Sequence, residues 1–540
     1  MTQDTPAFFT LDRGTISTTA ALIAPVDGRY RMVAAASAPV AVDPESVLED
    51  LAWRVARTDA SVAGSMEGWR DWSRLEVFSG RPPRAVLLAA SKATGELLER
   101  AFAAAGWTVA ARYYGPEPDI VGLGEACLEL ATDAVVMGGR EGVDEDEQAV
   151  AQQLWPRAAS LARFRDDLAV IACGPFVDRP EGIPDGRLFS LPAPEDLPVT
   201  AESGLRSAAL QVGRHLADHG ASPGIDARTA LRASVASLAS ILGASVDALE
   251  IGATAGSRTL AAPGAEQAHG VFATAGMLPR ELLEEDEAGD AVLRWSTLGG
   301  GDPAVRLDAL RDIALNPWAA SGADGAHLRM AALRGALDRL EAIWRGDAAA
   351  TDQGGAGVMV LGGGAFAGLP PAAVALAVVD GVRRAGAVSL LHDHAGVMAP
   401  LGALPVEADR QRLISDLMGD GLLALGSAIV TGTIRKPKKD EAPVTLSISS
   451  VLGDQRLRLE PGQLQLIDLP PGVTASIGLD PGEGSILGSE GGPITMELSG
   501  GLGGLFVDTR PIPLELPAGV EARRAALEAW EAPTWIGTER

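Results

Sequence analysis

The residues best suited to chemistry form three short clusters of glycine, hydroxyl and acidic side chains that lie far apart in the chain. They are Asp12-Arg13-Gly14-Thr15-Ile16-Ser17-Thr18, Glu250-Ile251-Gly252-Ala253-Thr254 and Leu361-Gly362-Gly363-Gly364-Ala365. Each cluster follows an apolar run that is typical of a strand. Carboxylates can orient a hydrated metal ion, and hydroxyl and backbone N–H groups can bind phosphates. Together the clusters predict a two-lobed clamp for a nucleotide and its metal ion.

The first cluster closes a predicted hairpin. Strands are expected at 8–11, 18–24 and 30–37, so that the carboxylate of Asp12 ends the first strand and the hydroxyl residues lie in the turn beside it. We predict that the phosphate-binding residues of this turn are Gly14, Thr15, Ser17 and Thr18. An ordinary hairpin with a polar turn is the alternative interpretation.

The second cluster follows a predicted helix at 227–242 and a strand at 248–251. Glu250 is then the carboxylate of a second hairpin, and Gly252 and Thr254 belong to its phosphate turn. Asp12 and Glu250 are therefore the candidate catalytic and metal-orienting residues. Here too, a purely structural hairpin is the alternative.

The third cluster places Gly362, Gly363 and Gly364 between a predicted strand at 358–361 and a predicted helix at 370–384. Without side chains, this backbone can approach a flat ring or a ribose closely. A flexible turn explains the same residues. Farther along, His392-Asp393-His394 invites a metal interpretation, but no third ligand cluster is nearby in the sequence, so a polar turn is favoured.

The elements that must position these clusters indicate an α/β fold. At 540 residues the chain exceeds one ordinary core, and two to four domains of about 100–200 residues are expected. Alternating strands and helices between 85 and 172 predict a parallel sheet with helices on its faces. The Pro- and Gly-rich stretch 178–198 is expected to be a loop at a lobe boundary.

The pattern changes after residue 423. Short strands separated by glycine- and proline-rich turns predict an antiparallel β-sandwich or barrel, followed by a helix at 520–530. The predicted domains are a first lobe with an α/β extension (1–200), a second lobe (201–425), a linker (426–440), a β domain (441–515) and a helix with its tail (516–540).

Composition limits the classes of partner. The chain has 45 basic and 71 acidic residues and a formal charge of −26, which disfavours nucleic acid and anionic membranes. Cys127 and Cys173 are too few for a disulfide framework and are expected to be small core residues. The N-terminal residues show no pattern of a signal peptide or anchor, so a cytoplasmic protein is expected.

In order and spacing, the clusters resemble the glutamate mutase L-type (MutL) family, which is unrelated to mismatch repair. The resemblance covers residues 7–425 and rests on Leu11–Thr19, Leu249–Thr254, Val360–Gly364 and the closing Gly396–Leu404 stretch. It implies a duplicated ribonuclease H-like fold of the actin, sugar kinase and Hsp70 superfamily around an ATP cleft. It also implies assistance to the assembly or reactivation of an adenosylcobalamin-dependent mutase.

Three departures from the family pattern bear on activity. A lysine is common where this chain has Thr19, the second carboxylate is Glu250 in place of aspartate, and Ala253 replaces a glycine. A glutamate reaches about one methylene farther and changes the metal geometry, and a Cβ at residue 253 limits approach of a phosphate. These changes bear on hydrolysis more than on fold.

The sequence therefore predicts an ATP- and Mg²⁺-binding, chaperone-like factor with weak ATPase activity and a mutase subunit as its partner. Two alternatives stay open: a scaffold that keeps the fold without binding nucleotide, and a small-molecule kinase in which Asp393 serves as the base. The β domain is expected either to bind the partner or to mediate self-association as a homo-oligomer.

Overall fold

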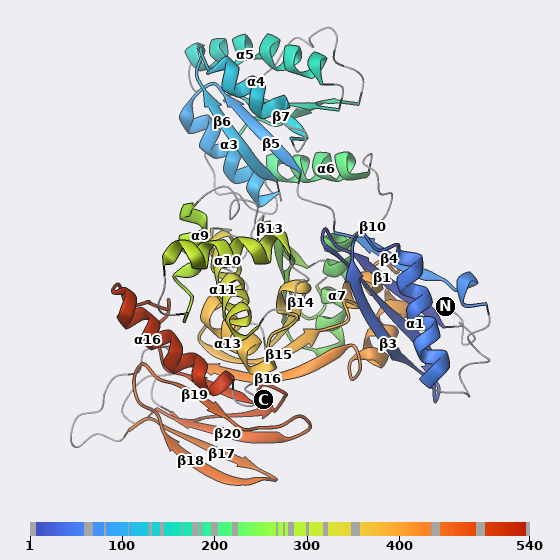
Figure 1. The fold of residues 1–540 in the computed structure, drawn as a ribbon, viewed down its shortest axis with the longest axis vertical. Coiled ribbons are helices and arrows are strands. Elements are labelled where there is room, and N and C mark those ends of the chain that lie inside the picture. The colour runs from blue at the N-terminus through green and yellow to red at the C-terminus, as the bar shows by residue number, and fades with distance from the viewer. Residues whose placement is uncertain are drawn as a thin grey trace.

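The protein is an α/β protein with mixed sheets, shown as a computed structural model in Figure 1. The structure describes residues 7–58, 68–79, 83–105, 107–128, 132–140, 145–165, 167–174, 183, 186–195, 204–218, 225–265, 268–273, 276–278, 286–298, 302–316, 322–346, 357–432, 434, 443–481 and 492–535. Two lobes, an inserted α/β unit and a C-terminal β region follow from the strand pairing.

The first lobe is built on a five-stranded sheet in the order β10-β4-β1-β2-β3. Its strands are β1 (Phe8–Arg13), β2 (Ser17–Val26), β3 (Arg29–Pro39), β4 (Arg74–Phe78) and β10 (Ile225–Asp226). β1, β2 and β3 form an antiparallel meander, whereas β4 is parallel to β1 and to β10. Helix α1 (Pro44–Thr58) covers one face through Val47, Leu48 and Leu51, and η2 (Trp69–Asp71) precedes β4.

The second lobe repeats this arrangement in an eight-stranded sheet of order β13-β12-β11-β14-β15-β16-β22-β19. Its first five strands are β11 (Val246–Ile251), β12 (Gly256–Ala261), β13 (His269–Ala273), β14 (Val358–Gly362) and β15 (Gly386–Asp393), and β16 (Leu422–Val430) follows. β11, β12 and β13 are an antiparallel meander, and β14 is parallel to β11 and β15. Strand pairing in the two lobes is therefore equivalent from β3 to β10 and from β13 to β15.

The two sheets share one apolar core. It combines Phe8 and Ala21 of the first lobe with Val246 and Ala248 of the second. Three helices complete this core: α7 (Ala227–Leu242), α14 (Met398–Gly402) and α15 (Glu407–Leu417). On the other face of the second sheet lie α9 (Asp286–Leu293), α10 (Pro303–Leu315), α11 (Ala323–Arg345) and α13 (Pro371–Gly381).

An inserted α/β unit separates β4 from β10 and lies at the top of Figure 1. Its parallel sheet has the order β6-β5-β7-β8-β9, a doubly wound order. The elements are β5 (Arg84–Ala89), α3 (Lys92–Ala104), β6 (Thr108–Tyr114), α4 (Ile120–Leu128), β7 (Ala134–Gly138), α5 (Glu145–Phe164), β8 (Ala169–Cys173), β9 (Leu188–Leu191) and α6 (Gly204–Asp218). The predicted loop at 178–198 thus contains a strand, β9.

Cys127 and Cys173 lie in the two cores of the insert and are buried free cysteines, as predicted. Burial raises the pKa of the Cys127 thiol to about 12.

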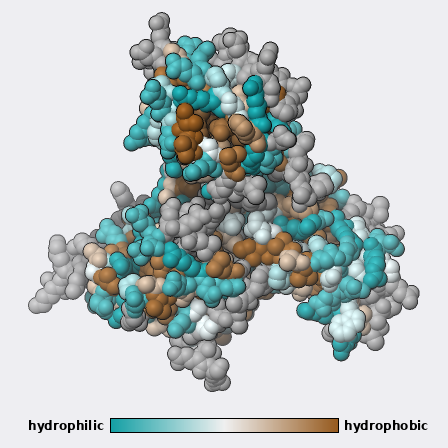
Figure 2. Space-filling view, turned by 45° about the horizontal axis from the view of Figure 1, so that its top comes forward, coloured by the Kyte–Doolittle hydropathy of each residue, from teal (hydrophilic) through white to brown (hydrophobic). Residues whose placement is uncertain are grey.

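In the space-filling view of Figure 2, brown apolar surface gathers on the insert at the top and across the middle of the molecule, among teal polar surface.

The C-terminal β region is divided between two sheets. β17 (Thr445–Ser450), β18 (Gly453–Arg458), β20 (Thr474–Asp480) and β21 (Ile494–Ser499) form the predicted antiparallel sheet, at the bottom of Figure 1. β19 (Leu464–Ile467) and β22 (Leu505–Asp508) instead extend the sheet of the second lobe beside β16. The boundary predicted at 426–440 stays a prediction, and residues 435–440 lie outside the described residues.

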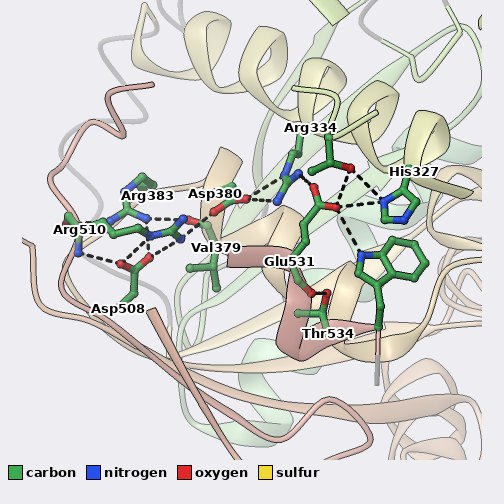
Figure 3. A network of polar contacts seen from close by, with 11 residues as sticks. His327, Arg334, Val379, Asp380, Arg383, Asp508, Arg510, Glu531 and Thr534 are labelled. Atoms are coloured by element: carbon green, nitrogen blue, oxygen red, sulfur yellow. Dashed lines mark hydrogen bonds and ion pairs between the residues drawn. The ribbon is translucent and has the colours of Figure 1, made fainter. Parts of the chain in front are cut away.

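Helix α16 (Val520–Glu531), followed by η4 (Ala532–Thr534), is held against the second lobe by a buried ionic network drawn in Figure 3. Arg334 of α11 pairs with Glu531, and Arg334 and Arg510 both pair with Asp380 of α13. Arg383 and Arg510 both pair with Asp508 of β22.

In the part of the chain that the structure describes, no helix has the length and apolarity needed to cross a membrane.

Candidate functional site

A cavity of about 600 Å³ lies where the two hairpin turns meet, and we call it the central cavity. Of the residues predicted for the site, nine line it: Asp12, Gly14, Thr15, Ser17, Glu250, Gly252, Thr254, Gly363 and Gly364. Thr18 and Gly362 are not among the lining residues. Thr18 is fully buried on β2, since successive side chains of a strand point to opposite faces.

The two hairpin turns have the same construction. The N–H of Gly14 donates to the carbonyl of Ser17 at 2.7 Å, and the N–H of Gly252 donates to that of Ala255 at 2.8 Å. The turns face one another, because the hydroxyls of Thr15 and Thr254 lie 3.4 Å apart. Residues separated by 239 positions in the sequence thus meet at one cavity.

The two predicted carboxylates occupy equivalent positions in the two sheets. Asp12 is the penultimate residue of β1 and Glu250 that of β11. Asp12 is opposite Thr19 on the antiparallel neighbour, and Glu250 is opposite Ser257. The matched register places both acids at the mouths of their hairpins, on the side that lines the central cavity.

A third acid, Asp393, lines the same cavity from the end of β15. Its two carboxylate oxygens accept the N–H groups of Val397 and Met398, each at 2.9 Å. Gly396 adopts φ 62°, and a Cβ there would lie 3.7 Å from Oδ2 of Asp12, so the 393–396 turn packs directly beside the first acid. The 392–394 segment, predicted to be a polar turn, instead ends strand β15 at Asp393, with the turn beginning at His394, and all three residues line the cavity.

Burial raises the pKa of all three acids, and neighbouring carboxylates add to this effect at Asp12 and Glu250. Burial, then the charges of Glu250 and Asp393, raise the pKa of Asp12 well above its usual range. Burial and the charge of Asp393 raise the pKa of Glu250 to about 7. Burial raises the pKa of Asp393 to about 6, although its backbone donors act in the opposite direction. Such a cluster of like charges requires protons or a cation to be stable.

The donor set fits a hydrated magnesium ion better than a directly ligated metal. Within the described residues, no group of three His, Cys, Asp or Glu side chains is placed to hold a metal ion. Oδ1 of Asp12, however, is a buried acceptor without a hydrogen-bond partner. Because Mg²⁺ retains several waters in nucleotide sites, Asp12 and Glu250 would hold it through those waters.

Sequence reasoning missed a cationic residue that acts on Glu250. Arg228, at the start of α7, lines the central cavity, and its charge lowers the pKa of Glu250 against the effect of burial. Its guanidinium pairs with Asp226 at 2.9 Å and lies 4.2 Å from the centre of the Phe272 ring. It therefore joins the first lobe to β13 of the second. An arginine two residues after a strand end carries no signal by itself in a sequence.

Thr19 stands where the resembled family commonly has a lysine. Its hydroxyl hydrogen-bonds that of Ser37 at 3.0 Å, and both residues line the cavity. Arg329 of α11 also lines it. Arg228 and Arg329, two arginines that line the cavity, were thus not included in the sequence prediction.

The glycine cluster serves two purposes. Gly363 has φ 92°, and a Cβ there would lie 2.4 Å from the carbonyl oxygen of Ile251, so this glycine lets η3 (Gly364–Phe366) pack on the second hairpin. At Gly364, by contrast, a Cβ would meet no described atom within 4 Å, and the cavity wall is open there. Nearby, Phe272, Met277, Leu278 and Ala326 provide apolar lining that suits a planar ring.

The histidines beside Asp393 are kept neutral. Burial, reinforced by His394, lowers the pKa of His392 to about 4, and burial lowers that of His394. Both line the central cavity. At neutral pH they therefore contribute no positive charge to offset the acids.

No family model matches the chain. A search of curated proteins returns no match.

Among solved structures, the PilM–PilN type IV pilus biogenesis complex matches 77% of this chain and 96% of its own at 14% identity, with a TM-score of 0.24. A nucleotide-free acetone carboxylase matches 84% of this chain and 80% of its own at 10% identity, with a TM-score of 0.28. A carbohydrate kinase from Novosphingobium aromaticivorans matches 78% and 94% at 14% identity, with a TM-score of 0.23.

At these TM-scores the superpositions are too loose to define a function. The class of the protein follows from its own strand pairing: two mixed sheets of equivalent order, each with an acid-tipped turn, meet at one cavity.

Proposed function

We propose that the protein is an actin-like, two-lobed ATPase that binds ATP with Mg²⁺ in the central cavity and hydrolyses it slowly. The observation that carries the proposal is the meeting of two equivalent acid-tipped turns, whose Thr15 and Thr254 hydroxyls lie 3.4 Å apart. The duplicated ribonuclease H-like arrangement that the sequence resemblance implies agrees with the equivalent strand orders. The three acids, without a metal-binding group of their own among the described residues, agree with a metal that arrives with the nucleotide.

In this proposal each group has a positional task. Asp12 and Glu250 would hold the hydrated metal, and Thr15, Ser17, Thr254 and the N–H groups of both turns, apart from those of Gly14 and Gly252 that bond within the turns, would donate to the phosphates. Bound Mg²⁺ would offset the charge that develops on the transferred phosphoryl group. Arg228 supplies the positive charge that a lysine at position 19 would have given. The apolar lining residues Phe272, Met277, Leu278 and Ala326 would contact the adenine ring.

The slow cycle is proposed to move the lobes. ATP contacts both turns, whereas ADP lacks the γ-phosphate that bridges them, so the two ligands stabilise the closed arrangement unequally. A partner that binds one arrangement would respond to the nucleotide. In this proposal the motion of the two lobes, rather than the hydrolysis itself, changes the state of the partner.

Isothermal titration with ATP, in the presence and absence of Mg²⁺, tests this function. We expect binding with Mg²⁺ and a loss of affinity of about tenfold or more without it, since the acids then face the phosphates without a counter-ion. Absence of heat at millimolar Mg²⁺–ATP would overturn the proposal and leave the scaffold alternative.

A kinase is the second candidate, because Asp393 does line the central cavity. Both oxygens of this carboxylate, however, already accept backbone N–H groups, which suits a residue that holds a turn in place. A panel of small phosphate acceptors separates the candidates. ADP release that depends on an acceptor would favour the kinase, and its absence would favour the ATPase.

We further infer, from the sequence resemblance alone, that the partner is a subunit of an adenosylcobalamin-dependent mutase. A pull-down of the purified chain with such a subunit, in ATP and in ADP, tests this step separately. Retention that depends on the nucleotide is expected. Equal or absent retention would remove the mutase proposal and leave the ATPase proposal standing.

A further inference from the structure

A second cavity, of about 540 Å³, lies between the second lobe and the C-terminal segment. Its walls come from α11, from α13 and from residues 513–523, and Trp295 adds an aromatic side. None of these residues lines the central cavity. We call this space the arginine cavity because of its charged residues.

The arginine cavity is positively charged in a strongly acidic chain. Four arginines line it, Arg294, Arg345, Arg383 and Arg523, against three acids, Asp338, Glu341 and Asp380. The lining therefore carries 4 − 3 = 1 net positive charge, whereas the whole chain carries −26. A pocket of this sign attracts anions and disfavours cations.

Ion pairs account for all but one of these charges. Arg383 binds Asp508, and Asp380 binds both Arg334 and Arg510, as Figure 3 shows. Arg294 pairs with Asp338, and Arg345 pairs with Glu341 at 2.9 Å. Within the described residues, Arg523 of α16 makes no ion pair, although it is half-buried.

A buried donor in the same lining also lacks a partner among the described residues. Nε1 of Trp295 has no hydrogen-bond acceptor there, and the side chain is 4% exposed. The Nε1 atom itself is closed off from the cavity, so the indole ring lines the space without offering a donor to a ligand. Among the described residues, the unpaired cation of this lining is therefore Arg523.

We propose that the arginine cavity binds a small organic anion, whose carboxylate or phosphate accepts hydrogen bonds from the guanidinium of Arg523 in the space that Trp295 also lines. Guanidinium groups recognise both anions in a bidentate manner. Leu514, Leu516 and Pro513 also line the cavity and offer apolar contacts to the body of the molecule. The proposal is independent of the nucleotide chemistry.

Titration of the full-length protein with inorganic phosphate and, separately, with succinate tests the site and distinguishes the two anions. Protein labelled with ¹⁵N-tryptophan gives the readout, since Trp295→Phe identifies the indole N–H signal of residue 295. We expect one anion to shift that signal in a saturable manner, with an affinity about tenfold weaker in Arg523→Gln because a charge-assisted hydrogen bond is lost.

Arg524→Gln is the matched control, since Arg524 neighbours Arg523, pairs with Glu521 and Glu528, and does not line the cavity. Its affinity for the anion should equal that of the wild type. Phosphate bound in the central cavity would respond to Arg228→Gln and leave the Trp295 signal unmoved.

Two results would overturn the proposal. The first is a Trp295 signal that neither anion moves at millimolar concentration. The second is an affinity that Arg523→Gln does not change. Arg523 is on the outer helix, so its variant is expected to fold, and circular dichroism verifies this.

Discussion

Buried carboxylates occur in two regions of this protein and are treated in opposite ways. In the network of Figure 3, burial alone would raise the pKa of Asp508 and Glu531, but their arginine partners outweigh it and lower both. In the central cavity, burial raises the pKa of Asp12, Glu250 and Asp393, and the charges of neighbouring acids add to this effect at Asp12 and Glu250. The carboxylates of the network are neutralised by arginines of the same chain, whereas those of the central cavity would be neutralised by a proton or a bound cation.

The largest effect is expected from the network. Arg510→Ala removes a guanidinium that pairs with both Asp508 and Asp380 and leaves those buried charges undercompensated. We expect the free energy of unfolding to fall by about 3–5 kcal/mol. Chemical denaturation measures it, with Arg524→Gln as the control, expected to cost about 0–1 kcal/mol because the partners of Arg524, Glu521 and Glu528, are exposed. A loss as small as that of the control would contradict the structural role of the network.

Removing a charged group from the central cavity should raise the free energy of unfolding, whereas removing one from the network lowers it. Asp12→Asn relieves repulsion, so the free protein is expected to be more stable than the wild type, whereas Asp508→Asn should be less stable. The same Asp12→Asn change should weaken Mg²⁺–ATP binding by about 100-fold, or ~2.7 kcal/mol. Thermal unfolding and titration calorimetry provide the two readouts. Destabilisation of the free protein by Asp12→Asn would show that its charge is structural.

The dependence of stability on pH separates the regions further. The pKa of Glu250 is raised from 4.5 to about 7, so the folded state binds more protons than the unfolded state between these values. Stability contributed by this group is therefore present at low pH and is lost as the pH rises toward 7. Asp508, whose pKa is lowered, contributes stability that is lost on acidification.

Glu250→Gln should consequently flatten the decline in unfolding free energy between pH 4.5 and about 7. Denaturant titrations at four or five pH values would measure it, and Mg²⁺–ATP should tighten its binding to the wild type over the same interval. A variant whose profile is as steep as that of the wild type would place the titrating group elsewhere.

The smallest effect is expected at the contact between the turns. Thr254→Val removes a hydroxyl but keeps the shape of the side chain, and its partner Thr15 is near enough for a weak bond only, at 3.4 Å. Affinity for Mg²⁺–ATP should fall by roughly three- to tenfold, in keeping with one neutral hydrogen bond. Ser240→Ala, at a hydroxyl that bonds to its own helix, is the control. Equal affinities for both variants would exclude a phosphate contact at Thr254.

Much of this arrangement was predictable because long periodic segments dominate it. The expected helices at 227–242 and 520–530 correspond to α7 and α16, and the two hairpins lie where the alternation of apolar residues ends. β4 and β10 were missed, since five and two residues are too short to show a period. Without them the sequence could not show that the α/β unit interrupts the first lobe.

The site was predicted where chemistry is local in the sequence and missed where it is not. Asp12 and Glu250 each lie two residues before a turn glycine, and that spacing is visible in the sequence. Arg228 was not predicted, and Asp393 was named only as the base of the kinase alternative, because both residues reach the cavity through the sheet order, which no local pattern encodes. Gly363 was predicted to let the backbone approach a ring or ribose, and this stays a prediction; in the structure its close neighbour is the backbone of Ile251.

The central claim is that two distant turns grip one nucleotide, and hydrogen–deuterium exchange measures it most directly. Peptides covering 12–19 and 250–257 should both gain protection when Mg²⁺–ATP is added to the wild type, and neither should in Asp12→Asn at the same concentration. Protection confined to one turn, or absent from both while the nucleotide is bound, would contradict a shared site.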